Sequence, residues 1–84
     1  MIESAQIRGA RALLGLSQAG LSELASVSAT TIKRLEGTST IRGAAETLWK
    51  IQTALEEAGV EFIPADETKG PGVRLRHRTR DKQP

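Results

Sequence analysis

The sequence predicts a mainly helical protein of one small domain, in which four helices are followed by a short β-hairpin or pair of strands. Apolar residues recur at helical spacing as far as Ala58, and from Val60 onwards apolar and polar residues alternate instead. A chain of 84 residues is long enough to bury one small core and too short for two.

The first helix is expected over about residues 2–14. Ile7, Ala10 and Leu14 share one face of it, with Leu13 beside them, and Gly15 follows as its stop. Gly9 lies inside this helix and lowers its helix propensity by about 1 kcal/mol relative to alanine. We expect this glycine to admit the close approach of another helix.

Two short helices are expected next, over residues 18–25 and 29–36. Ser17 and Ser28 each precede a helical run, where a hydroxyl can cap the free backbone N–H groups. Gly37 is placed to end the second of these helices in a left-handed conformation. The apolar positions that we expect to hold the two helices against each other and the core are Leu21, Leu24, Ala25, Val27, Ile32 and Leu35.

The outward face of residues 29–36 carries Ala29, Thr30, Lys33 and Arg34. Small residues at the N-terminal end and long cations further along allow a helix to enter the major groove of DNA without a clash. Threonine, lysine and arginine are also common on an ordinary solvated helix face. These helices alone leave both interpretations open.

The capped pair of helices resembles the helix-turn-helix of XRE-type transcriptional regulators, the phage-repressor-like (lambda repressor-like) proteins of bacteria, phages and mobile elements. The sequence departs from the family pattern at Ser26, where glycine is usual because the turn residue adopts a positive φ. A serine in that conformation costs roughly 1 kcal/mol. The residues that carry the resemblance are Leu16, Ser17, Gln18, Leu21, Leu24, Ala25, Val27, Ser28, Thr31, Ile32, Leu35, Glu36 and Gly37.

The resemblance implies a repressor-like DNA-binding domain and a role for each matching position. It implies that Gln18 braces a phosphate and the start of the third helix, and that Arg11 and Glu36 form a buried structural ion pair. The base contacts that it implies come from Ala29, Thr30, Lys33 and Arg34. The contacts to the DNA backbone that it implies come from Gln18, Ser28, Thr31, Thr38, Ser39, Thr40 and Arg42. For the last four residues, a polar loop of capping residues is an equally good interpretation.

The fourth helix is expected over about residues 44–58, with Gly59 as its stop. Trp49 lies next to the apolar stripe of this helix, and we expect it in the core, with a contact to a second subunit as the alternative. The stripe itself consists of Ala44, Leu48, Ile51, Leu55 and Ala58.

Alternating residues at 60–63 and 73–78 predict the hairpin or pair of strands. Such a ribbon is marginal in water, so it either folds back on the fourth helix or pairs with the same strand of a second subunit. A homodimer would suit an inverted-repeat operator with half-sites roughly 34 Å apart. The apolar side, which would serve dimerisation, consists of Val60, Phe62, Val73 and Leu75. The basic side consists of Arg74, Arg76 and Arg78.

Three segments follow from these patterns. We expect a helix-turn-helix DNA-binding domain at 1–59, a β-strand extension for dimerisation at 60–78 and a disordered tail at 79–84. The net charge of +2 is uneven: residues 1–63 carry six basic and seven acidic side chains, and residues 64–84 carry six and three. Because few cations lie on the third helix, we expect its affinity for DNA to depend on a second copy or on the tail.

Other function classes receive no support from the sequence. There is no cysteine, His77 has no second metal ligand nearby, and no catalytic constellation or phosphate-binding loop is present, so we expect no enzyme, metal or cofactor. No apolar run approaches the roughly 18 residues of a membrane span, and no signal peptide is recognisable. We therefore expect a cytoplasmic bacterial protein, located at the nucleoid when bound to DNA.

Three functional hypotheses remain open. The first is a sequence-specific, dimeric DNA-binding transcriptional regulator. The second is a protein-binding module, such as an antitoxin or an adaptor of another regulatory protein, that uses the strand edge at 73–78. The third is a ribbon-type DNA binder that places its arginine strand in a groove. We favour the first.

Overall fold

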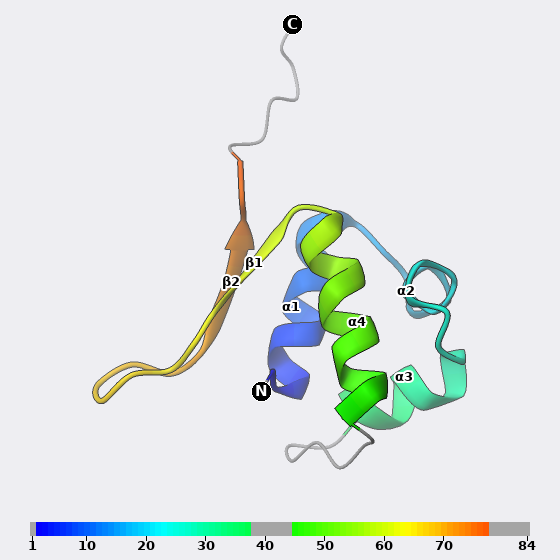
Figure 1. The fold of residues 1–84 in the computed structure, drawn as a ribbon, viewed down its shortest axis with the longest axis horizontal. Helices are drawn as coiled ribbons and strands as arrows, with labels where there is room; N and C mark the ends of the chain where they lie inside the picture. Colours follow the sequence, from blue (N-terminus) through cyan, green and yellow to red (C-terminus); the bar gives the residue numbers. More distant parts are fainter. Residues whose placement is uncertain (1, 38–44, 78–84) are drawn as a thin grey trace, which may run out of the picture.

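A computed structural model describes residues 2–37 and 45–77. It confirms the mainly helical class with a C-terminal two-stranded antiparallel sheet. The hairpin lies on one side of α1 and α4, and α2 and α3 lie on the other (Figure 1). The elements in these ranges are α1 (Ser4–Leu14), α2 (Gln18–Ala25), α3 (Ala29–Glu36), α4 (Ala45–Glu57), β1 (Val60–Ile63) and β2 (Gly72–Leu75).

The two short helices begin where the sequence predicts. The Oγ of Ser17 accepts a hydrogen bond from the backbone N–H of Gly20 at 2.8 Å, and the Oγ of Ser28 accepts one from the N–H of Thr31 at 3.1 Å. Each serine has extended backbone, and its hydroxyl oxygen satisfies a backbone N–H that has no partner within the helix. At the end of α1, Gly15 adopts φ 68°, the left-handed conformation of a helix stop.

One apolar core joins the four helices and β1. No helix among the described residues is long and apolar enough to cross a membrane. The core residues are Ile2, Ile7, Ala10, Leu21, Ala25, Val27, Ile32, Leu35, Leu48, Ile51, Ala54, Leu55 and Val60.

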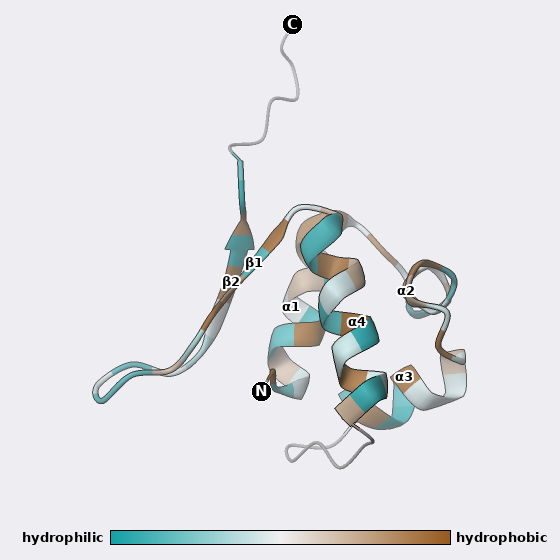
Figure 2. Ribbon diagram, viewed as in Figure 1, coloured by the Kyte–Doolittle hydropathy of each residue, from teal (hydrophilic) through white to brown (hydrophobic). Residues whose placement is uncertain are grey.

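The hairpin belongs to the same core, because it folds back on the helices of its own chain. β2 packs along α1, while β1 packs against α4 and α1. The strands pair with Val60 opposite Leu75 and Phe62 opposite Val73. Val60 is completely buried, and Phe62 and Val73 pack against the core. The helical part and the strand extension are therefore one packing unit, although the hydrophilic tip of the hairpin projects beyond the helices (Figure 2).

Two residues of α1 fix the hairpin in this position. Gln6 is buried, and its Nε2 donates to the carbonyl of Gly72 at 3.0 Å and to that of Ile63 at 3.4 Å, so that it links both strands to the helix. A Cβ at Gly9 would lie 3.1 Å from the Cγ2 of Val73. The expectation that Gly9 admits another helix is wrong: it admits the strand β2.

The expectation that Trp49 lies in the core is also wrong, because its side chain is 67% exposed. Each residue of an α-helix is turned by about 100° from the one before it. Since Leu48 and Ile51 point into the core, Trp49 points away from it. The same geometry leaves Leu24 exposed at the edge of α2, beside the buried Leu21, and leaves Ala58 exposed beyond the end of α4. Ala44 lies outside the described residues.

Candidate nucleic-acid interface

The surface that could meet DNA is the exposed face of α3, which we call the reading face. Ile32, Leu35 and Glu36 are buried on the opposite side of this helix. Among the described residues no ion pair occupies Lys33 or Arg34, so both cations are directed to solvent. The reading face consists of Ala29, Thr30, Lys33 and Arg34, all of which are exposed, as the sequence predicts.

The turn between α2 and α3 has the geometry that the resemblance requires, despite its serine. Ser26 adopts φ 57° and ψ 43°, and among the described residues it is the only non-glycine residue with a positive φ. The backbone N–H groups of Ser26 and Val27 both donate to the carbonyl of Ser22, and Val27 is buried in the core. The strained residue is thus held by hydrogen bonds and by the apolar anchor that follows it.

Behind the reading face, Arg11 of α1 and Glu36 of α3 form the predicted ion pair. Both contacts are short: the Nε of Arg11 lies 2.8 Å from Oε2 of Glu36, and its Nη2 lies 2.8 Å from Oε1. The Glu36 side chain is 3% exposed and that of Arg11 21%. This planar two-bond geometry is the strongest arrangement of an arginine and a carboxylate. It fixes the end of α3 relative to α1.

Arg11 also holds the connection that leads into α2. Its Nη1 donates to the carbonyl of Leu16 at 2.9 Å, while the N–H of Leu16 donates to the carbonyl of Arg11 at 2.9 Å. The guanidinium therefore joins the end of α1, the entry to α2 and the end of α3. The role of this residue is structural, because its donor groups are directed to protein atoms.

Gln18, the first residue of α2, contacts the other end of α3 from the one that the resemblance implies. Its Nε2 donates to Oε1 of Glu36 at 3.1 Å, at the last residue of α3 and not at the first. A side-chain amide nitrogen has a second hydrogen, and Gln18 is half-exposed. The expected phosphate contact is therefore compatible with this position.

The electrostatic setting of Glu36 favours its ionised form. Burial alone raises the pKa of this carboxyl group, but hydrogen bonds from Arg11 and Gln18, together with the charges of Arg11 and Arg8, lower it by more. The net result is a pKa below the ordinary value of 4.5. The hydrogen bond to Glu36 in turn raises the pKa of Arg11, so the pair is charged at neutral pH.

The end of α3 differs from the prediction, because Gly37 is not left-handed but has φ −87° and ψ 3°. Its N–H still bonds to the carbonyl of Lys33 at 3.0 Å. Arg8 of α1 donates from Nη1 to the free carbonyl of Glu36. The guanidinium of Arg8 thus satisfies the last carbonyl of α3, which has no partner within the helix. This role of Arg8 is not evident from the sequence pattern, although the residue lies one helical turn before Arg11 and on the same face.

The candidate backbone contacts are only partly within the described residues. Ser28 is exposed, and its hydroxyl donates to the Oγ1 of Thr31 at 2.8 Å, so both hydroxyls lie at the N-terminal end of α3. The free N–H groups and the positive end of the helix dipole are at this end, where a phosphate binds most readily. Four of the predicted contacts lie outside the described residues: Thr38, Ser39, Thr40 and Arg42.

The arginines of the hairpin have partners within the chain. Arg74 forms a two-bond pair with Glu61 across the strands, at 3.0 and 3.2 Å, and the Nη2 of Arg76 donates to the carbonyl of Glu56 at 2.6 Å. Arg78 lies outside the described residues. The basic side of the ribbon is therefore less available to DNA than the reading face.

The residues expected to dimerise through the hairpin are engaged by the chain's own core to different extents. Val60 is completely buried, so its side chain cannot contact a second subunit on this surface. Phe62, Val73 and Leu75 are half-buried.

Comparisons with known proteins do not assign the chain to a family. The chain matches no protein-family model, and no curated protein matches it significantly. Within residues 2–37 and 45–77, no group of three or more histidine, aspartate or glutamate side chains could hold a metal ion. The XRE resemblance therefore stays a prediction, carried by the motif residues and their arrangement.

Proposed function

We propose that the chain is a transcriptional regulator that binds double-stranded DNA sequence-specifically as a homodimer, reads an inverted repeat and has no catalytic role. The observation that carries this proposal is the contrast between the two faces of α3. One face is fixed to α1 and α2 through Ile32, Leu35 and Glu36, and the other presents Lys33 and Arg34 without partners among the described residues. A rigid, basic and otherwise unoccupied helix face suits the major groove.

The position of the hairpin supports the same function. It lies on the far side of α1 and α4 from the pair α2 and α3, so it would not obstruct the approach of α3 to DNA (Figure 1). On this proposal, the protein acts in the bacterial cytoplasm and is located at the nucleoid when bound. A regulatory protein partner is compatible with it.

The test is the selection of bound sequences from a random duplex pool at moderate salt. The wild-type chain is compared with Arg34→Ala and with a control, Arg74→Ala, which removes the same charge from the hairpin. We expect wild type and Arg74→Ala to enrich the same inverted repeat, and Arg34→Ala to enrich it with the preference lost at one position of each half-site. The proposal is wrong if no form enriches a sequence, or if only Arg74→Ala loses the enrichment.

The alternative of a protein-binding module is favoured by one feature, the two-stranded sheet. Each strand pairs on one side only, with β1 next to β2 and no third strand among the described residues. Such an edge can accept a strand from another protein. In the same selection, this alternative predicts only weak binding that is lost as the salt concentration rises.

A further inference from the structure

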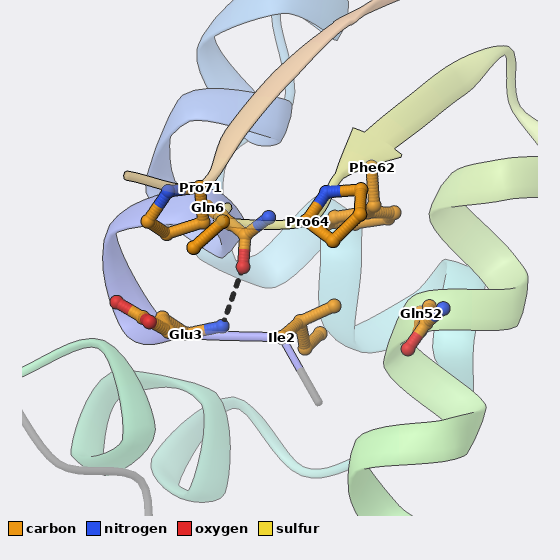
Figure 3. Close-up of a pocket in the computed structure, with 8 residues that line it drawn as sticks. Ile2, Glu3, Gln6, Gln52, Phe62, Pro64 and Pro71 are labelled. Atoms are coloured by element: carbon orange, nitrogen blue, oxygen red, sulfur yellow. Dashed lines mark hydrogen bonds between the residues drawn. The ribbon is translucent and has the colours of Figure 1, made fainter. Parts of the chain in front are cut away.

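A hollow lined by five apolar and three polar residues lies between the hairpin, the start of α1 and the middle of α4. Its volume is about 490 Å³, within the range of roughly 300–1,000 Å³ that is typical of binding pockets. Phe62, Pro64 and Pro71 lie on the hairpin side, Ile2 and Glu3 lie across from them, and Gln52 of α4 closes one flank (Figure 3). The remaining lining residues are Gln6 and Ala65.

The polar groups at the base of this hollow are already satisfied. The Oε1 of Gln6 accepts from the backbone N–H of Glu3 at 2.8 Å, and its Nε2 donates to the carbonyls of the two strands. An apolar group could therefore enter over Gln6 without leaving the amide of this residue unpaired. Gln52 uses its Nε2 for Glu56 at 3.1 Å, and its Oε1 accepts no hydrogen bond from the described residues. This oxygen is therefore an acceptor that a partner molecule can use.

The most exposed large apolar side chain among the described residues belongs to α4, the helix that contributes Gln52 to the hollow. Trp49 is 67% exposed and precedes Gln52 by three residues on α4. Residues three apart on a helix are surface neighbours, with Cβ atoms about 5–6 Å from each other. The molecule thus carries a large exposed aromatic side chain close to a partly apolar depression.

We propose that a second copy of this chain occupies the hollow, with Trp49 of each copy inserted into the hollow of the other. A two-fold axis between Trp49 and the hollow places Trp49 of each copy opposite the hollow of the other. The same contact then occurs twice and gives a closed, symmetric interface. The indole N–H, which needs an acceptor when buried, would meet the Oε1 of Gln52, which has no donor among the described residues. This inference rests on the homodimer of the proposed function and names its interface.

The charges around both features fit this arrangement. Glu3 is the only charged residue among those that line the hollow. Trp49 is flanked on α4 by Glu46 and Lys50, so the projection carries no net charge and brings one cation towards Glu3 of the other copy. Glu46 and Lys50 carry opposite charges, so the flanks of Trp49 present no excess of negative charge to Glu3.

The area indicates a weak dimer. Each inserted indole ring buries about 150–250 Å² of its own surface and a similar area of the hollow that receives it. The two contacts of the dimer together bury on the order of 600–1,000 Å². Stable interfaces bury roughly 1,200–2,000 Å². We therefore expect a mainly monomeric chain at low concentration and a dimer that two neighbouring half-sites on DNA promote.

The experiment uses the fluorescence of Trp49, the only tryptophan of the chain. Its emission and its quenching by acrylamide are recorded over a wide range of protein concentration, with sedimentation equilibrium on the same samples. We expect a blue shift and reduced quenching that follow dimer formation. Ala65→Glu, which places a charge on an exposed lining position, should weaken the dimer about tenfold or more. The control Ala19→Glu, on the exposed side of α2, should leave it unchanged.

Three results would overturn the inference. These are a chain that remains monomeric even on the selected duplex, a dimer in which Trp49 stays fully accessible to the quencher, and a dimer that Ala65→Glu leaves intact. Failure of the proposed function would differ from these results, since no form would enrich a DNA sequence. If only the interface is correct, the fluorescence changes occur without any enrichment. If only the function is correct, Ala65→Glu still enriches the same inverted repeat as the wild-type chain does.

Discussion

Among the described residues, two arginine–glutamate pairs have nearly the same geometry and opposite environments. The pair of Arg11 and Glu36 is enclosed between α1, α2 and α3 and receives a third hydrogen bond from Gln18. The pair of Arg74 and Glu61 lies on the outer side of the hairpin, with side chains 66% and 44% exposed. Pairs with similar distances therefore have different roles. The enclosed pair holds the reading face in place, whereas the outer pair contributes little to stability.

The largest expected effect is that of Glu36→Ala. The substitution leaves Arg11 without its partner in a mostly enclosed site, so the free energy of unfolding should fall by about 3–5 kcal/mol. Urea denaturation measures this loss. Equal stability of the variant and the wild-type chain would contradict the role given to the enclosed pair.

The pH dependence of the same pair should be smaller and has a definite sign. The pKa of Glu36 in the folded chain lies below its ordinary value of 4.5. The pair's contribution is therefore complete above about pH 4.5 and is lost as the pH falls through the lower, folded pKa. The difference in unfolding free energy between the wild-type chain and Glu36→Ala should accordingly narrow in acid. A difference that stays constant or grows would contradict the ionised pair.

The smallest effect is expected from the outer pair. Glu61→Ala and Arg74→Ala should leave the urea midpoint unchanged within error, because both side chains remain hydrated and their attraction is screened. A double-mutant cycle at low and high salt would detect any coupling. A strong, salt-resistant coupling would remove the distinction between the two pairs.

Local chemistry made the elements predictable from the sequence. Ser17, Ser28 and Gly15 act within a few residues of themselves, so their roles as caps and stop could be inferred without a structure. The change from helical to alternating periodicity at Val60 likewise predicted the hairpin. The ion pair of Arg11 and Glu36, separated by 25 residues, followed only from the family resemblance.

The misplaced residues depend on contacts between distant segments. Gly37 is not left-handed, and the last carbonyl of α3 accepts a hydrogen bond from Arg8, which belongs to another helix. Trp49 is outside the core because α4 is rotated so that Leu48 and Ile51 are buried. The sequence alone does not determine this rotation closely, because Trp49 is itself apolar and lies next to the apolar stripe of the helix. The role of Gln6 could not be inferred, because it depends on the strands that lie along α1.

The central claim is that the reading face with Arg34, and not the hairpin with Arg74, distinguishes DNA sequences. Its most direct test is to titrate the selected duplex, and duplexes with single base-pair changes, with Arg34→Ala and Arg74→Ala. One specific base contact is worth about 1–3 kcal/mol, so Arg34→Ala should lose roughly fivefold to 150-fold in discrimination at one position of each half-site, while Arg74→Ala retains the wild-type ratio. Full discrimination by Arg34→Ala, together with its loss in Arg74→Ala, would contradict the account and assign the reading of DNA to the hairpin.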